Sequence, residues 1–342
     1  MRVAMFDDSI PFDGDSPAAG PLGHAEKAFA LLPAAFAKAG HEVRVFNRAA
    51  APATCGGARW ETWGAERPQE TDILIAYRRP ELLGAVARAK RRFMWLAGDA
   101  AYLGHGNNRA WIATKEPVLV FMSRAHSETY ENPDRLRAAL IPPGLAAPHL
   151  EEIRPQPSDP PHAVCTAHPL HGVDWLVEQW RERIHPILPR AELHLYSAAL
   201  TRAARGEPVA PSFSRVAALV AAAAEAGVRV KAPATDAAMA EAFRAARAHL
   251  HPGHYSEAYC HTIAESQSCG VPAVVRPRGA AEQRVAHNAT GFVHAEDDGF
   301  AMAVLRLLGD EATYRRMSDQ ARAMQRGRSW GEAASDFEMH WG

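Results

Sequence analysis

The sequence contains no long run of apolar residues. No stretch reaches the roughly 18 consecutive apolar residues that a membrane-spanning helix needs. The apolar start, Met1–Phe6, is too short for a signal peptide and is better explained as a buried strand. Peripheral association with a membrane stays open, although the chain has no basic amphipathic helix that would favour it. We therefore expect a cytoplasmic protein.

Cysteine is scarce, and neither sign of charge is in excess. The four cysteines, Cys55, Cys165, Cys260 and Cys269, have no metal-ligand spacing and are too few for a disulfide framework. The spacing therefore predicts reduced thiols and no metal site. With 38 basic and 39 acidic residues the net charge is -1, which gives no reason to expect a nucleic-acid partner. Contacts with phosphate, where they occur, should be local.

The 342 residues are too many for one ordinary core and suit two domains. Apolar, strand-like segments alternate with helical ones throughout, which is typical of an α/β fold with parallel sheets. A polar, proline-rich stretch at 146–161 is the best candidate for an interdomain linker. In the first half we expect strands at 2–6, 41–46, 72–77, 92–96 and 118–123, helices at 23–39 and 80–90, and a loop at 50–70. In the second half we expect strands at 162–166, 192–196, 227–230 and 273–275, and helices at 175–185, 236–248, 298–308 and 310–326.

Two carboxylates, Glu257 and Glu265, stand eight residues apart in the most informative stretch, 249–293. A polar segment at 258–262 separates them and leads into a helix-like run, which Gly270 should end before a buried strand. Ligands of doubly wound sheets bind where strands end and helices begin, and backbone N–H groups at a helix start favour an anion. With Glu265 about two turns into the helix, both carboxylates can serve one cleft. The competing interpretation is a solvated helix face.

This register resembles the retaining glycosyltransferases of family 4, also called group 1, whose signature is Glu-x7-Glu followed by a small-Gly-x-Pro strand. The resemblance implies a GT-B fold, in which two Rossmann-like domains face a cleft and the last helix returns to the first domain. It places the acceptor-side domain at 1–148, a linker at 149–161, the nucleotide-sugar domain at 162–326 and the crossover helix at 327–342.

The resemblance also implies roles for individual residues. Glu257 would bind hydroxyls of the donor sugar as a catalytic residue, and Glu265 would bind the ribose hydroxyls. Backbone N–H groups of the segment Tyr259–Thr262 would hold the diphosphate, and Cys260 is expected to pack rather than to act as a nucleophile. The remaining expected donor-site residues are Thr166, His171, Gly172, Lys231, Ala232, Tyr259, Cys260, His261 and Thr262.

The chain departs from the family where the donor diphosphate is clamped. The family has an Arg and a Lys-Gly pair in this loop, whereas this chain has His171-Gly172 and no Arg. A neutral His neutralises a diphosphate less, but it can donate a hydrogen bond or be protonated by the phosphate. The alternative is that His168 and His171 are ordinary loop histidines.

A second departure lies in the first half. Many members carry His-Asp where this chain has Gly98-Asp99; Asp99 is kept as a second catalytic candidate. His24 or His105 would have to replace the missing His, or activity is weakened. Gly23, His24 and Ser123 are the candidates for the acceptor side. A tight turn at Gly23 and helix capping by Ser123 are the simpler alternatives.

The activity implied is transfer of a hexose-type sugar from a nucleoside-diphosphate sugar, of UDP or GDP type, to an acceptor hydroxyl with retained configuration. The acceptor would be a glycan, a lipid-linked molecule or a small molecule. No coenzyme and no essential metal are expected. Two other interpretations stay open: a non-catalytic sugar-nucleotide binder and a GT-B sugar-nucleotide epimerase.

Overall fold

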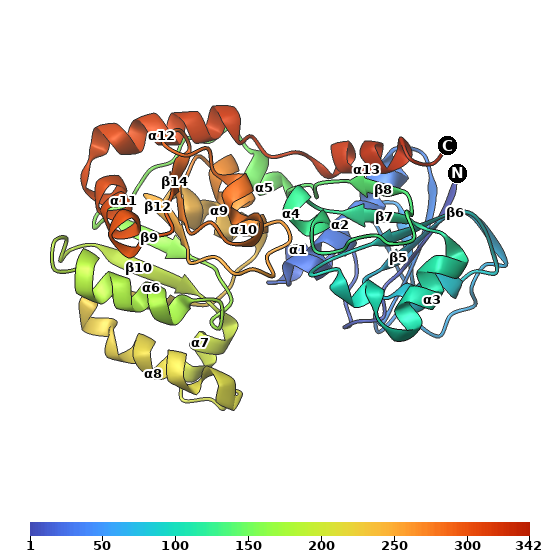
Figure 1. Cartoon of the computed structure of the whole chain (residues 1–342), viewed down its shortest axis with the longest axis horizontal. Coiled ribbons are helices and arrows are strands. Elements are labelled where there is room, and N and C mark those ends of the chain that lie inside the picture. Colours follow the sequence, from blue (N-terminus) through green and yellow to red (C-terminus); the bar gives the residue numbers. More distant parts are fainter. The chain divides into compact units, whose positions relative to one another are not determined.

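The computed structural model describes all residues, 1–342, and divides into two compact units (Figure 1). The first comprises Met1–Ala146 and Arg328–Gly342, and the second comprises Ala147–Gly327. Residues 149–161, which we expected to be a linker, lie within the second unit. The chain passes between the units after Ala146 and again after Gly327.

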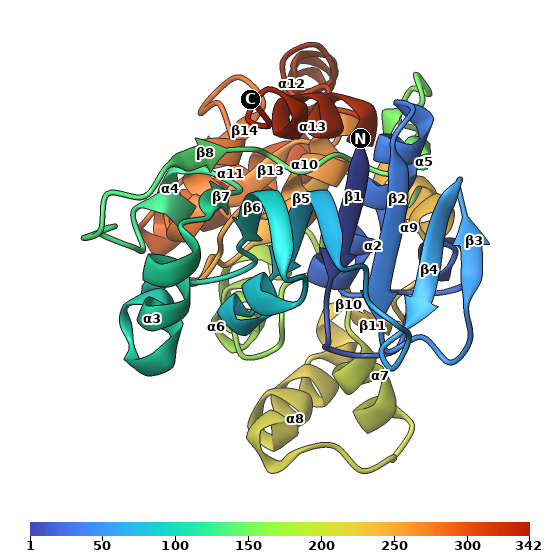
Figure 2. The same cartoon turned by 90° about the vertical axis from the view of Figure 1, so that its right-hand side faces the viewer.

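The first unit is built on an eight-stranded sheet in the order β3-β4-β2-β1-β5-β6-β7-β8 (Figure 2). All neighbouring strands are parallel except the antiparallel pair β3–β4. The strands are β1 (Arg2–Phe6), β2 (Glu42–Asn47), β3 (Ala53–Cys55), β4 (Ala58–Thr62), β5 (Glu70–Tyr77), β6 (Arg88–Trp95), β7 (Val118–Phe121) and β8 (Ala138–Leu140). The helices and 3-10 turns are α1 (Ser16–Ala19), α2 (His24–Lys38), η1 (Pro80–Gly84), η2 (Ala101–Gly104), α3 (Gly106–Lys115), α4 (Arg124–Ser127) and α13 (Trp330–Glu338).

Two expectations for this unit were wrong. The predicted loop at 50–70 contains the hairpin β3–β4, and Trp60 of β4 is fully buried. The predicted helix at 80–90 is replaced by the turn η1 and the start of β6. The Ala-, Leu- and Arg-rich composition favours a helix locally, but main-chain pairing of β6 with β5 from Arg88 onward overrides that propensity.

The last helix, α13, belongs to the first unit (Figure 1). A capping box formed by Ser329 and Glu332 begins it. Its residue Phe337 is 1% exposed and packs edge-on against Phe36 of α2 and Trp95 of β6. The crossover segment is therefore part of this unit's core.

The second unit has a six-stranded parallel sheet in the order β11-β10-β9-β12-β13-β14. The strands are β9 (His162–Cys165), β10 (Glu192–Tyr196), β11 (Val228–Lys231), β12 (Ala248–His251), β13 (Ala273–Val275) and β14 (Gly291–Val293). The α-helices are α5 (Ala147–Leu150), α6 (Val173–Gln179), α7 (Ala198–Ala204), α8 (Ser214–Ala222), α9 (Asp236–Arg244), α10 (His261–Ser268), α11 (Asp297–Gly309) and α12 (Glu311–Met324). A π-helical turn, η3 (Trp180–Ile184), extends α6, and 3-10 turns occur at η4 (Pro211–Phe213), η5 (Ala224–Ala226) and η6 (Gly279–Arg284).

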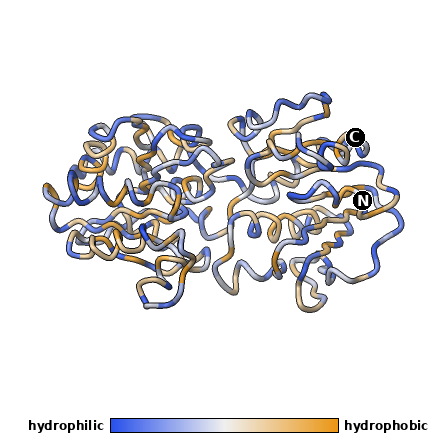
Figure 3. The backbone as a smooth tube through the Cα atoms, turned by 60° about the horizontal axis from the view of Figure 1, so that its bottom comes forward, coloured by the Kyte–Doolittle hydropathy of each residue, from blue (hydrophilic) through white to orange (hydrophobic).

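Each unit has its own hydrophobic core between sheet and helices. The largest cluster in the second unit joins β9, β10 and β12 to α6, α8 and α11. A separate cluster in the first unit joins β1, β5, β6 and β7 to η1 and α3. Hydrophobic segments concentrate on the inner strands and helices, whereas the outer turns are mainly hydrophilic (Figure 3). No helix is long and apolar enough to cross a membrane.

Candidate functional site

The carboxyl ends of β9 and β12 bring two of the predicted loops together in the second unit. The strands are neighbours in a parallel sheet, so the loops that follow them leave from the same edge. The loop after β9 carries His171, and the loop after β12 carries Glu257. The Nδ1 atom of His171 lies 3.6 Å from Oε1 of Glu257. Two residues that are 86 positions apart in the sequence thus lie close together at this edge of the sheet.

The backbone of Glu257 is fixed by the turn η6. The Ala280 N–H donates to the Glu257 carbonyl at 2.9 Å. This approach requires a glycine at 279, where φ is +56° and a Cβ would lie 2.6 Å from the His254 carbonyl oxygen and 2.9 Å from that of Glu257. Gly279 was not recognised from the sequence, because only the fold brings it against the Glu257 loop.

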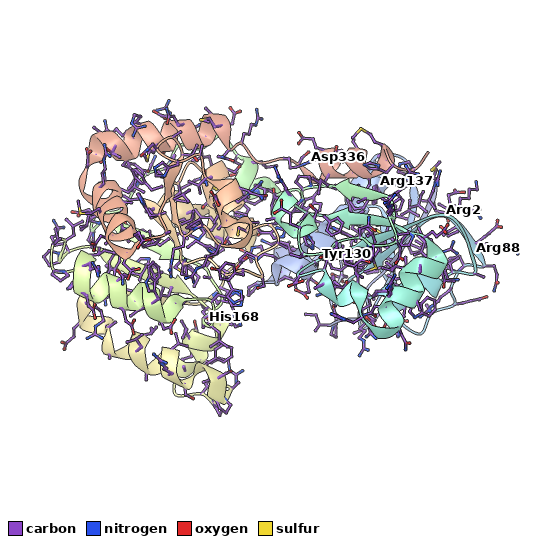
Figure 4. The ribbon with its side chains drawn as sticks, viewed as in Figure 1. Arg2, Arg88, Tyr130, Arg137, His168 and Asp336 are labelled. Atoms are coloured by element: carbon purple, nitrogen blue, oxygen red, sulfur yellow. The ribbon has the colours of Figure 1, made fainter.

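Three more histidines surround Glu257 and His171. His254 stacks on His171 with ring centroids 3.9 Å apart, and His168 lies 4.8 Å from His171. Figure 4 shows His168 in the loop that follows β9. His251, at the end of β12, is 3.8 Å from Glu257 through its Nε2 atom. Loss of solvent is the main cause that lowers the pKa of His168, His251 and His254; repulsion from the His171 ring lowers it further, and the Glu257 carboxylate opposes the shift. The site therefore gathers four imidazoles around the Glu257 carboxylate.

Helix α10 begins at His261, directly after this cluster. Glu265 is therefore its fifth residue, little more than one turn in, and not two turns in as expected. The predicted phosphate-binding segment forms the approach to the helix: Tyr259 and Cys260 are buried, and His261 and Thr262 are half-buried at its first two positions. Burial raises the pKa of the Cys260 thiol well above its usual value, which fits the expectation that it packs as a thiol.

Glu265 belongs to a different cluster from Glu257. Its Oε1 atom lies 3.8 Å from Nε2 of the fully buried His149, and Oδ1 of Asp236 lies 3.4 Å from the same nitrogen. Glu265 itself is 5% exposed. Sequence reasoning missed His149, which falls in the expected linker and has no local signal. The two carboxylates of the Glu-x7-Glu motif thus have separate histidine partners.

Four other predicted donor-site residues lie at the same edge of the sheet. Thr166, after β9, makes a hydrogen bond of 3.2 Å with His249, whose other ring nitrogen is 2.8 Å from Ser266 of α10. Gly172 has φ +84° and precedes α6. Lys231 and Ala232, at the end of β11, are exposed. At this edge of the sheet, Thr166 is held by hydrogen bonds, whereas Lys231 and Ala232 are exposed to solvent.

In the first unit, Gly23 caps α2 and His24 is its first residue. A Cβ at Gly23 would collide with the Glu26 carboxylate. That carboxylate accepts a hydrogen bond of 2.7 Å from Arg78, which also donates to Asp7 at 3.1 Å. Asp7 and Arg78 were not predicted. They follow β1 and β5, which are neighbours in the sheet, so a pairing could have been inferred from topology but not from spacing.

Asp99 and Ser123 both cap turns. Oδ1 of the exposed Asp99 accepts from the N–H of Ala101, at the start of η2. The Ser123 hydroxyl accepts from the His126 N–H, so it has the capping role that we gave as the simpler alternative. Gly98 has φ +141°, a conformation that other residues rarely adopt, so this loop is shaped for glycine and not for the family's His.

The comparisons with known proteins agree with this fold. Residues 217–324 match the family model described as glycosyl transferases group 1. No curated protein matches the sequence. Sucrose-phosphate synthase from Thermosynechococcus elongatus superposes with a TM-score of 0.74 at 14% identity, covering 99% of this chain and 98% of that one.

Two further solved structures are similar over nearly their whole length. Anabaena Alr3699/HepE, solved in complex with UDP and glucose, gives a TM-score of 0.70 at 14% identity and 99% coverage of both chains. WaaG, a glycosyltransferase involved in lipopolysaccharide biosynthesis, gives 0.63 at 14% identity and 98% coverage of both. The chain therefore has the GT-B fold, and residues 217–324 match the glycosyl transferases group 1 model.

Proposed function

We propose that this protein is a retaining glycosyltransferase that moves a hexose-type sugar from a nucleoside-diphosphate sugar to an acceptor hydroxyl. UDP and GDP are the donor nucleotides that we favour, with no essential metal. The observation that carries the proposal is the meeting of Glu257 and His171, 3.6 Å apart, at the start of α10. Glu257 lies within the matched segment 217–324, and Anabaena Alr3699/HepE, which has the same fold, was solved with UDP and glucose.

In this proposal each group has a distinct task. The Glu257 carboxylate accepts hydrogen bonds from sugar hydroxyls and orients the anomeric carbon. His171 donates a hydrogen bond to the diphosphate, and the first N–H groups of α10 add to its stabilisation as it leaves. The departing phosphate oxygen takes the proton of the acceptor hydroxyl, which attacks from the same face of the sugar. Configuration is thereby retained.

Glu265 is assigned to the ribose of the donor. A carboxylate can accept two O–H bonds from a vicinal diol. His149, 3.8 Å from its Oε1, and the tight packing of α10 keep the Glu265 side chain in one orientation. Gly23, His24 and Ser123 are assigned to the acceptor, whose identity the first unit would select, and Asp99 is kept as the second catalytic candidate.

The test is thermal unfolding with UDP, GDP, ADP, TDP and CDP, followed by transfer assays with sugar derivatives of the nucleotide that binds. A ligand at 100 times its Kd stabilises the folded state by about 2.7 kcal/mol, which corresponds to a shift of several degrees. We expect one diphosphate to stabilise the protein and Glu257→Gln to retain that shift but lose sugar transfer. Glu225→Gln, an exposed change outside the site, should alter neither. Failure of all five diphosphates to bind would refute the proposal.

A second candidate function, a non-catalytic sugar-nucleotide binder, is favoured by one observation. The backbone at Gly98 has φ +141°, a conformation that residues other than glycine rarely adopt, which argues against the His that the family uses for the transferred sugar. Such a binder would saturate with the nucleotide sugar but release no free nucleoside diphosphate, either by transfer or by hydrolysis. Measurement of nucleotide release over many hours separates the two functions.

A further inference from the structure

Three side chains of different chemistry point at one position beside α10. Nε2 of His251 lies 3.8 Å from Oε1 of Glu257 and 3.9 Å from Sγ of Cys260. Sγ of Cys260 lies 3.8 Å from Oε2 of Glu257. His251 and Cys260 thus approach different oxygens of the Glu257 carboxylate, and one ligand atom from each of the three side chains lies within 4.8 Å of the other two. We call this set the His251–Glu257–Cys260 triad.

The spacing of the triad suits a metal ion. The 3.8 Å between Nε2 of His251 and Oε1 of Glu257 is well beyond the about 2.9–3.0 Å of an ordinary hydrogen bond between nitrogen and oxygen, whereas the two contacts of the Cys260 sulfur are long, weak hydrogen bonds. Because one ligand atom from each of the three side chains lies within 4.8 Å of the other two, there is a point no more than roughly 2.8 Å from all three atoms. Bonds from zinc to His, carboxylate and Cys are about 2.0–2.3 Å long. An ion at that point therefore reaches all three groups after side-chain movements of less than about 1 Å.

The environment of His251 and Cys260 also suits a bound ion. His251 is 3% exposed, and its Nδ1 atom has no hydrogen-bond partner. Its Nε2 atom makes only a weak hydrogen bond of 3.9 Å with the Cys260 sulfur and lies 3.8 Å from Oε1 of Glu257, too far for a normal hydrogen bond, so the ring is poorly satisfied for a buried imidazole. Cys260 has φ +61°, a left-handed conformation that residues with a Cβ rarely adopt. The backbone would prefer glycine at 260, yet a thiol is placed there.

We propose that the His251–Glu257–Cys260 triad is a binding site for Zn²⁺. Zinc takes nitrogen, oxygen and sulfur ligands together, whereas calcium and magnesium take oxygen. On binding, the Cys260 thiol releases its proton to solvent and the thiolate bonds to the metal. His171, whose Nδ1 atom is 3.6 Å from Glu257 and has no hydrogen-bond partner, is the nearest candidate for a fourth ligand.

The site has a consequence for sugar transfer, which rests on the proposed function. A zinc ion on Glu257 would occupy the carboxylate that is assigned to the donor sugar. Zinc and the sugar nucleotide should therefore exclude each other, and zinc should act as an inhibitor competitive with the donor. The metal would not be a cofactor of the reaction.

The test measures metal binding without any nucleotide, so it does not depend on the proposed function. The full chain is stripped with a chelator and titrated with ZnCl₂ by calorimetry, and with CoCl₂ by absorption spectroscopy. We expect one ion per chain and a thiolate-to-cobalt charge-transfer band in the near ultraviolet. Cys260→Gly should abolish the band and weaken zinc binding at least about 100-fold, because it removes a ligand and not merely a group that supports one.

The variants are chosen so that misfolding cannot mimic the result. Glycine is the residue that φ +61° favours, so Cys260→Gly is expected to fold. Cys165→Ala removes a different buried thiol and should leave both the band and the affinity unchanged. The proposal is overturned if the wild type binds zinc no more tightly than Cys260→Gly, or if cobalt binds without the thiolate band.

Discussion

Substitution of Gly279 by Ala tests whether the Glu257 loop depends on the close approach of η6. The positive φ of +56° by itself should cost an alanine about 1–2 kcal/mol. In addition, its Cβ would lie 2.6 Å from the His254 carbonyl oxygen, 2.9 Å from that of Glu257 and 3.0 Å from the Glu257 Cβ. Overpacking of this kind typically costs about 1–3 kcal/mol more. Part of the strain can be relieved only if Glu257 moves.

Gly206→Ala is the matched control. Gly206 also lies in the second unit and has a positive φ, +73°, but nothing lies within 4 Å of its Cβ position. It should therefore show the conformational cost alone. At about 2–4 °C per kcal/mol, Gly279→Ala should melt several degrees below Gly206→Ala.

Two assays are needed, because stability and site geometry are separate consequences. Thermal unfolding compares the two variants without ligand. Nucleotide titration then compares them at a temperature where both are folded, and Gly279→Ala should bind the sugar nucleotide more weakly than the control. Equal melting temperatures for the two variants would refute the steric argument. Wild-type affinity in Gly279→Ala would show that the position of Glu257 does not depend on η6.

The remaining predictions concern stability and the diphosphate contact. Burial lowers the pKa of His126 and of His162 from 6.5 to about 4, so the unfolded chain binds more protons than the folded protein between these pH values. The melting temperature should therefore fall as the pH drops from about 6.5 to 4. A melting temperature that does not change in this range would contradict the prediction. Phe337→Ala should lower the free energy of unfolding, measured by chemical denaturation, by about 3–5 kcal/mol, because the Phe337 ring is 1% exposed. Met339 is 73% exposed, so Met339→Ala should lower it little. Equal losses of stability would show that α13 is not part of the core. His171→Lys should tighten binding of the nucleoside diphosphate about three- to tenfold, because it adds a permanent positive charge. Titration calorimetry can measure this change in affinity. Weaker binding would mean that the imidazole itself is needed.

The sequence predicted those elements whose signals are local. Alternating apolar strands and helices, with Gly40 and Gly270 ending two of the helices, were sufficient to predict two parallel α/β units. The helix predicted at 80–90 failed because pairing with β5 draws Arg88 onward into the sheet, and that pairing partner lies outside the segment whose composition was considered. Local composition indicates which secondary structure a segment favours in isolation, but not which one it adopts when it pairs with another strand.

Some residues of the candidate site could likewise be predicted from local sequence motifs, and others could not. Glu257 and His171 were predicted through a motif in each loop, and the sheet brings them together because β9 and β12 are neighbours. The pairing of Glu265 with His149 had no such motif. The wider set of histidines around Glu257 depends on where two loops meet, which no spacing within either loop encodes.

The chain leaves the first unit and returns to it at two segments that lie side by side within that unit. Leu145 bridges to Ser329, and its N–H donates to the Arg328 carbonyl at 2.8 Å. Gly144 approaches the Trp330 backbone so closely that any Cβ would collide with it. The second unit is thus an insertion in the first. During synthesis on a ribosome its whole length is made before α13, so the first unit stays without part of its core until then. If synthesis stops before α13 is complete, the first unit should therefore fail to fold, whereas the second unit, which was made later, should still fold.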